Sequence, residues 1–137
     1  MLKAKRIMLI ENNPKDADNI LNIIESLNSN YKLLHFTTTK EALENLKKEN
    51  ISSQLILLGS SNGDDDSIEF LKNIKNDNNL KKIPVVIIST SEEHIHVLNC
   101  FIYGAASYMV KPGKHLELAG LIKTIVQYWN ICELPCV

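Results

Sequence analysis

Residues 85–88 read Val-Val-Ile-Ile, and residues 55–58 read Leu-Ile-Leu-Leu. A strand with one face in water alternates apolar and polar residues, whereas these two runs are apolar at every position. Each run therefore predicts a central strand that helices cover on both faces. Together with three further apolar runs, the predicted strands are 6–10, 31–36, 54–58, 84–88 and 107–110.

Longer segments with the periodicity of helices separate these strands. Capping residues mark three of the helix starts, because a side-chain oxygen there can accept the free N–H groups of the first turn. These starts are Asn13 before Pro14, Thr38 with Glu41, and Asp66 with Glu69. Five such units predict a doubly wound α/β protein with a five-stranded parallel sheet. We expect a single domain over 1–137, with its core at 5–130 and a C-terminal tail at 131–137.

The fourth helix is predicted at 92–102, and its apolar residues recur at helical spacing. The residues expected to face inward are Ile95, Leu98 and Phe101. Two histidines on this helix, His94 and His96, are two residues apart and therefore do not share a face. That spacing argues against a metal pair, and both histidines are expected to face solvent.

Composition and charge indicate an ordinary globular protein, with 45% hydrophobic and 23% charged residues. A net charge of -1 gives no electrostatic reason for binding nucleic acid. The apolar run at 7–10 is too short for a signal peptide or a membrane span, so we expect a cytoplasmic protein with no membrane contact. The cysteines have no metal or redox spacing and are expected to be reduced; they are Cys100, Cys132 and Cys136.

Loops at the carboxyl ends of parallel strands meet at one edge of a doubly wound sheet, and sites form there. The loops after the first, third, fourth and fifth strands are Glu-Asn-Asn-Pro at 11–14, Gly-Ser-Ser-Asn-Gly at 59–63, Ser-Thr-Ser at 89–91 and Lys-Pro-Gly at 111–113. No phosphate-binding loop rich in Gly, Ser or Thr follows the first strand. The alternative is a flavin-binding protein of similar fold. The sequence does not support it, because no site for an anionic cofactor is predicted after the first strand.

These segments resemble, in order, the landmarks of response-regulator receiver domains, over roughly residues 5–128. The resemblance rests on Ile-Met-Leu-Ile-Glu-Asn-Asn-Pro at 7–14, Leu-Ile-Leu-Leu at 55–58, Ile-Pro-Val-Val-Ile-Ile-Ser at 83–89 and Gly-Ala-Ala-Ser-Tyr-Met-Val-Lys-Pro at 104–112. It implies a flavodoxin-like (βα)5 receiver fold with strand order 2-1-3-4-5. It also implies a stand-alone, chemotaxis-type receiver of a two-component phosphorelay.

In that family, two acidic residues, an acceptor aspartate, a hydroxyl residue and a lysine surround Mg²⁺ and a phosphoryl group. The dication binds carboxylate oxygens and offsets negative charge while the acceptor carboxylate attacks phosphorus. The matching positions in this chain are, in the same order, Glu11, Asn12, Gly59, Ser89 and Lys111.

Two of these five positions lack the required chemistry. Gly59 has no side chain to phosphorylate, and the amide of Asn12 is a far weaker Mg²⁺ ligand than a carboxylate. Glu11 and Lys111 carry opposite charges that sum to zero, so a metal is not needed for neutrality. We therefore expect the two side chains to approach each other, with no cofactor, no Mg²⁺ and no phosphotransfer activity. A residual metal-binding role for Glu11 is the alternative.

Three further features each have two interpretations. A relocated acceptor in the acidic loop would make the protein a phosphorylatable receiver, although one of its aspartates is explained as a helix cap. The aspartates concerned are Asp64, Asp65 and Asp66. Ser89 and Thr90 either form a switch or hydrogen-bond to the loop backbone. Tyr108 resembles the family's switch aromatic, but a tyrosine at a strand end is also a common half-buried packing residue.

The fifth helix, at 114–130, carries more apolar residues than contact with one sheet face requires. Some should form a partner surface, unless the tail folds back over them. The residues expected on this surface are Leu118, Ile122, Ile125 and Trp129. Family members commonly use the fourth helix, fifth strand and fifth helix for dimer and target contacts. The resemblance thus implies a histidine kinase, another response regulator, a scaffold protein or a second copy of the chain as partner.

Overall fold

The computed structural model describes residues 5–27, 31–48, 55–60 and 65–132. Strands and helices alternate along the chain as the sequence predicts. The elements are β1 (Lys5–Ile10), α1 (Pro14–Leu27), β2 (Tyr31–Phe36), α2 (Thr39–Lys48), β3 (Leu55–Ser60), α3 (Asp65–Asn76), β4 (Val85–Ser89), α4 (His94–Ile102), β5 (Ser107–Val110) and α5 (His115–Ile131). Gln54, Cys136 and the predicted tail beyond residue 132 lie outside the described residues. No helix in the described part of the chain is long and apolar enough to cross a membrane.

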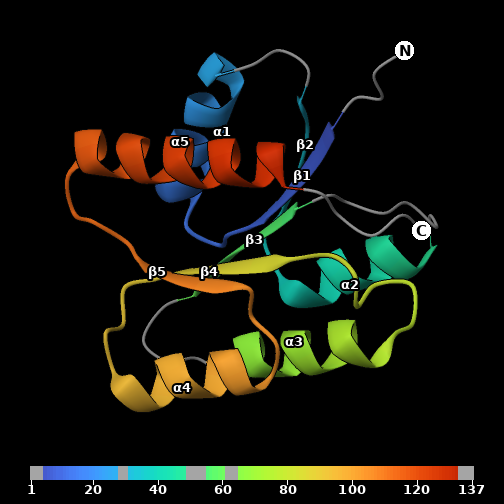
Figure 1. Ribbon diagram of the computed structural model, residues 1–137. Coiled ribbons are helices and arrows are strands. Elements are labelled where there is room, and N and C mark those ends of the chain that lie inside the picture. The colour runs from blue at the N-terminus through green and yellow to red at the C-terminus, as the bar shows by residue number, and fades with distance from the viewer. Residues whose placement is uncertain (1–4, 28–30, 49–54, 61–64, 133–137) are drawn as a thin grey trace.

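The five strands form one parallel sheet in the order β2-β1-β3-β4-β5, as predicted (Figure 1). Helices α1 and α5 cover one face of this sheet, and α2, α3 and α4 cover the other. In the register of the sheet, Gly59 on β3 pairs with Ile88 on β4, and Ser60 pairs with Ser89. The carboxyl ends of these strands lie side by side, so the residues that follow them meet at one edge.

The two central strands are buried on both faces, as their continuous apolar runs predict. On β3, Ile56 and Leu58 belong to the core beneath α2, α3 and α4. Leu55 and Leu57 point the other way, into the core beneath α1 and α5. Strand β4 alternates between the two cores in the same manner, and all of its residues are buried. The doubly wound α/β fold is therefore confirmed.

Two of the three predicted helix caps are confirmed by hydrogen bonds. These run from the N–H of Asp16 to Asn13 Oδ1 (3.1 Å) and from the N–H of Glu41 to Thr38 Oγ1 (3.2 Å). Helix α3 begins at Asp65, so Asp66 lies within its first turn, one residue after the helix begins. Three consecutive aspartates carry the same capping signal, so the sequence does not distinguish which of them begins the helix.

Helix α4 packs on the sheet through the side opposite to the one predicted. It begins at His94 instead of residue 92, and its buried residues are His96 and Cys100. The apolar residues that face solvent are Ile95, Leu98, Phe101 and Ile102, with exposed fractions of 64%, 45%, 48% and 63%. The predicted inward stripe and the predicted exposure of His96 are both wrong, whereas His94 is exposed as expected. Periodicity identifies the residues that share a face, but not the face that packs on the sheet.

Helix α5 packs its main apolar stripe on the sheet. Leu118, Ile122 and Ile125 are buried in the core that α5 shares with α1, so the predicted partner surface at these residues is wrong. Their spacings of four and three place them on one face of the helix, and that face contacts the sheet. Trp129 is half-buried, with its ring edge-on to Tyr128 and the ring centroids 5.1 Å apart. The large apolar side chains of α5 that remain exposed are Leu116, Tyr128 and Ile131.

Candidate functional site

An ion-paired cluster lies at the carboxyl edge of the sheet. Lys111, just after β5, places its Nζ 2.9 Å from Glu11 Oε1, just after β1, and 3.0 Å from Asp16 Oδ2 on the first turn of α1. The side chains of Lys111 and Glu11 are 11% and 5% exposed, and that of Asp16 is 32% exposed. The predicted approach of Glu11 and Lys111 is confirmed. Asp16 is a second partner that the sequence does not predict, because its contact with Lys111 depends on how the first turn of α1 is oriented.

The Glu11 side chain is fixed through both of its oxygens. Oε1 accepts a hydrogen bond from Lys111 Nζ, and Oε2 accepts one from the backbone N–H of Asn13 at 3.2 Å. The Glu11 backbone is also held, because its N–H donates to Phe36 O at 3.0 Å and His35 Nε2 lies 3.0 Å from its carbonyl oxygen. The carboxylate is therefore held in one place.

The charges of the cluster favour the ammonium form of Lys111. Partial burial opposes that charge, but hydrogen bonds to Glu11 and Asp16 and the charges of the two carboxylates outweigh it. The pKa of Lys111 is consequently raised above the ordinary lysine value of 10.5. Two carboxylates and one ammonium leave this cluster with a formal charge of -1.

Gly59 is the position at which the cluster touches β3. A Cβ atom added there would lie 2.5 Å from Glu11 Oε1, 2.9 Å from Glu11 Cδ and 3.0 Å from the carbonyl oxygen of Ile10. Carbon atoms do not approach carboxylate oxygens so closely, so a side chain at this position would have to displace Glu11. The Glu11 carboxyl group thus fills the space in which a side chain of residue 59 would begin.

These residues do not fit the Mg²⁺ site that the resemblance implies. The two oxygens of Glu11 accept hydrogen bonds from Lys111 Nζ and from the N–H of Asn13, and Gly59 offers no oxygen from a side chain. Asn12 is exposed. Across the part of the chain that the structure describes, no three His, Cys, Asp or Glu side chains are arranged to hold a metal ion.

The loop after β4 is held by short-range hydrogen bonds. Ser89 is fully buried, and its Oγ accepts the N–H of Ser91 at 3.0 Å, which confirms the predicted bond to loop backbone. Ser91 Oγ in turn accepts the N–H of Glu93 at 3.2 Å. The backbone N–H of Lys111 donates to Ser89 O at 2.7 Å and so joins the ends of β4 and β5. Thr90 is exposed.

Tyr108 on β5 is half-buried, and its hydroxyl group points toward α4. The hydroxyl donates to the carbonyl oxygen of Ser91 at 2.8 Å and lies 2.7 Å from Nδ1 of His96. The two interpretations of this tyrosine are a packing residue and a switch. The structure places it in a packed and hydrogen-bonded position, and its movement remains a prediction.

The acidic loop is only partly described. Asp64 and the side chain of Asp65 lie outside the described residues, whereas Asp66 is exposed on the first turn of α3. Asp66 is therefore a surface residue of the helix that follows β3, whereas the carboxylates that meet Lys111 are those of Glu11 and Asp16.

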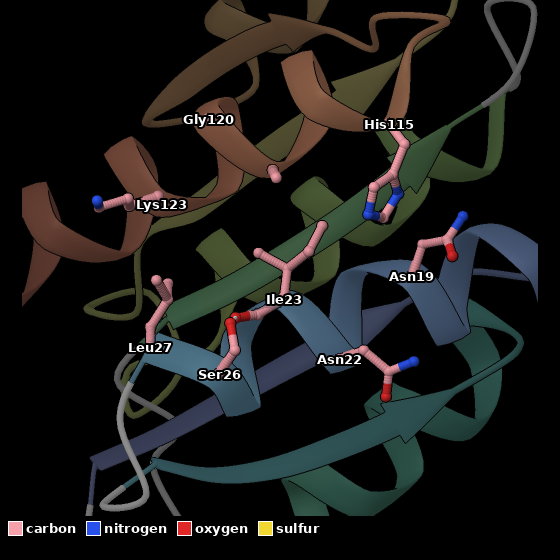
Figure 2. Close-up of a pocket in the computed structure, with 9 residues that line it drawn as sticks. Asn19, Asn22, Ile23, Ser26, Leu27, His115, Gly120 and Lys123 are labelled. Atoms are coloured by element: carbon pink, nitrogen blue, oxygen red, sulfur yellow. Dashed lines mark hydrogen bonds between the residues drawn. The ribbon is translucent and has the colours of Figure 1, made fainter.

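A separate hollow of about 460 Å³ lies between α1 and α5. Figure 2 shows Asn19 and His115 at one end of it and Leu27 and Lys123 at the other. It opens beside Gly120, where nothing lies within 4 Å of an added Cβ atom. None of the residues that line it belongs to the ion-paired cluster, so the hollow is a different surface feature.

Known proteins share this fold and these segments. The family description "Response regulator receiver domain" matches residues 7–123. The transcriptional regulatory protein CrdR of Helicobacter pylori is 32% identical over 119 residues, which are 87% of this chain and 54% of CrdR. The two-component response regulator-like APRR1 of Arabidopsis thaliana is 26% identical over 116 residues, which are 85% of this chain and 18% of APRR1. The chain thus spans less than two thirds of each of these curated relatives.

A solved structure with the same fold is that of the phosphorylated cyanobacterial phytochrome response regulator RcpA. It superposes with a TM-score of 0.87 at 29% sequence identity, and the match covers 96% of this chain and 99% of RcpA. The likeness therefore covers nearly the whole of both chains.

Proposed function

Because the chain belongs to the response-regulator receiver family, we propose that it works in two-component signalling as a receiver that is not phosphorylated at the usual position. In this proposal it acts through protein–protein contacts and is not an enzyme. The observation that carries the proposal is the position of the Glu11 carboxyl group. It fills the space beside Gly59 where an acceptor side chain would begin, and it is paired with Lys111.

The chemistry of the cluster supports this proposal. Transfer of a phosphoryl group to a carboxylate requires that an oxygen be free to attack phosphorus in line. Both oxygens of Glu11 accept hydrogen bonds, and the side chain is almost fully buried. An attack by Glu11 would first have to break its pair with Lys111 and leave the ammonium without its most buried partner.

The proposal also includes a site that works without Mg²⁺. In a site with three carboxylates and a lysine, a dication is needed to offset the excess negative charge. Here the Lys111 ammonium group lies between Glu11 and Asp16, and the formal charge that remains is -1, compared with -2 for three carboxylates and a lysine. The lysine thus stabilises the carboxyl edge in the absence of metal and phosphoryl group.

The surface we propose for partner contacts is the exposed apolar face of α4. Its members are Ile95, Leu98, Phe101 and Ile102, with Val110 of β5 also exposed. An exposed group of large apolar side chains on one helix usually marks a contact with another protein. The partner surface predicted from the sequence lay on α5, but most of its residues are buried, so we propose the exposed face of α4 in its place. The partners we propose are a histidine kinase, another response regulator, a scaffold protein or a second copy of the chain.

Intact-protein mass spectrometry after incubation with Mg²⁺ and acetyl phosphate tests the proposal. We expect the mass to stay unchanged, while a receiver that has its acceptor aspartate gains one phosphoryl group under the same conditions. An adduct that hydroxylamine removes would instead point to an aspartyl phosphate. In that case a variant with Asp64, Asp65 and Asp66 all changed to Asn would show whether the acceptor has moved into the acidic loop.

A further inference from the structure

Helix α4 is attached to the body of the protein through one polar side chain, His96, and the thiol of Cys100, which belongs to the hydrophobic core. Helices that cover a sheet usually pack an apolar stripe on it and expose polar residues. In α4 the buried residues are His96 and Cys100, while four large apolar residues of the same helix are exposed. The position of α4 therefore depends on what His96 and Cys100 contact.

Those contacts form a connected set that we call the His96 network, made up of Ser91, His96, Cys100 and Tyr108. His96 Nδ1 lies 2.7 Å from the Tyr108 hydroxyl oxygen, and the two rings meet edge to face with centroids 5.5 Å apart. The Tyr108 hydroxyl donates to the carbonyl oxygen of Ser91 at 2.8 Å. Cys100 Sγ lies 3.7 Å from His96 Nε2. The network thus joins α4 to β5 and to the loop after β4.

The role of the Tyr108 hydroxyl in the network is determined by its two neighbours. The single proton of the Tyr108 hydroxyl goes to Ser91 O, so the hydroxyl oxygen must accept a hydrogen bond from Nδ1–H of His96. The Cys100 thiol beside Nε2 of the same ring can accept a hydrogen bond from that nitrogen or donate its own proton to it. Burial raises the pKa of the Cys100 thiol to about 11, so that proton is present at neutral pH.

We propose that the His96 network fixes α4 against β5 and so holds the exposed apolar face of α4 in one arrangement without a phosphorylation event. The inference rests on the proposed function in that it takes this face as the partner surface. Hydrogen bonds in a buried chain strengthen one another, and a broken link leaves a buried donor or acceptor without a partner. Loss of one member should therefore loosen the whole helix.

Hydrogen exchange of the α4 amides in the Tyr108→Phe variant tests this. The substitution removes one oxygen atom and leaves Nδ1–H of His96 and the carbonyl oxygen of Ser91 without their partner. We expect the α4 amides to exchange roughly tenfold faster than in the unaltered protein. The matched control is Tyr103→Phe, which makes the same change at an exposed tyrosine at the end of the same helix and should leave exchange unchanged. Equal exchange rates in the two variants would overturn the proposal.

A second measurement uses the unaltered protein and does not depend on how the variants fold. Ring nitrogen chemical shifts from NMR should show that Nδ1 of His96 carries a proton. A His96 ring whose Nδ1 carries no proton would contradict the network. Neither measurement uses a phosphoryl donor. If these measurements contradict the His96 network and mass spectrometry finds no phosphoryl adduct, the proposed function still holds. If they support the network and an adduct is found, only the proposed function is contradicted.

Discussion

At the residue scale, the site at the carboxyl ends of the strands depends on the position of the Glu11 side chain. With no side chain on Gly59, Glu11 lies against β3 and meets Lys111 there. The opposite charges of this pair could be predicted from the sequence, because Glu11 and Lys111 follow two strands whose ends share an edge. The participation of Asp16 could not, since it depends on how the first turn of α1 is oriented toward Lys111.

Gly59→Ala should destabilise the protein by about 1–3 kcal/mol, because the added carbon overlaps the Glu11 carboxyl group in a packed site. The control is Gly120→Ala in α5, where nothing lies within 4 Å of the added carbon. Alanine in a helix interior should stabilise by about 0.5–1 kcal/mol relative to glycine. Urea unfolding measures both, and a neutral Gly59→Ala variant would show that Glu11 is not held as described.

Lys111→Met should cost about 3 kcal/mol of unfolding free energy, because it leaves the buried Glu11 carboxylate without its cation. Lys114→Met, three residues away at an exposed position, should change stability by less than about 0.5 kcal/mol. Adding Glu11→Gln to Lys111→Met should restore part of the loss, since the unpaired charge is then gone. If Lys111→Met were as mild as Lys114→Met, the ion pair would contribute nothing to the fold.

The raised pKa of Lys111 gives stability a defined dependence on pH. A group with a higher pKa in the folded state binds its proton more tightly there, so its contribution is complete below the unfolded value of 10.5 and is lost as pH rises through the folded value. The difference in urea midpoint between the unaltered protein and Lys111→Met should therefore be constant near neutral pH and shrink above about pH 10.5. A difference that stayed constant throughout the alkaline range would contradict the charged pair.

At the scale of the element, the largest difference between prediction and structure is the face of α4 that packs on the sheet. Its apolar residues recur at helical spacing and do share one face of the helix. That face is exposed to solvent, because His96 on the opposite face is hydrogen-bonded to Tyr108 of β5. The contact joins residues twelve apart on different elements, so no local pattern reveals it. Leu118 of α5 differs in the opposite direction: it is predicted on a partner surface and is buried in the core.

Leu98→Ala should leave the unfolding free energy within about 0.5 kcal/mol of the original, because Leu98 is a solvent-facing residue of α4. Leu71→Ala makes the same change at a fully buried residue of α3 and should cost about 2–5 kcal/mol. Chemical unfolding of the two variants compares them directly. A Leu98→Ala cost near that of Leu71→Ala would mean that the apolar face of α4 is packed inward after all.

At the scale of the whole molecule, the sequence was sufficient for the fold. The continuous apolar runs of β3 and β4 require helices on both faces of the sheet, and this restricts the topology to few choices. The sequence also located the edge where Glu11, Gly59 and Lys111 meet, because parallel strands bring their carboxyl ends together. The burial of His96 on the inner side of α4 could not be predicted from the sequence, since burial of a polar group depends on a partner from another element.

The central claim is that the site around Glu11, Gly59 and Lys111 binds neither Mg²⁺ nor a phosphoryl group. Its most direct test is an NMR titration of the ¹⁵N-labelled protein with Mg²⁺ and then beryllofluoride. Beryllofluoride takes the place of a phosphoryl group only where a carboxylate acceptor and a dication meet. We predict that the amide signals of Glu11, Gly59, Ser89 and Lys111 will not move at either step. Saturable shifts at these amides would show that the edge opens to a metal and an acceptor, and would contradict the account.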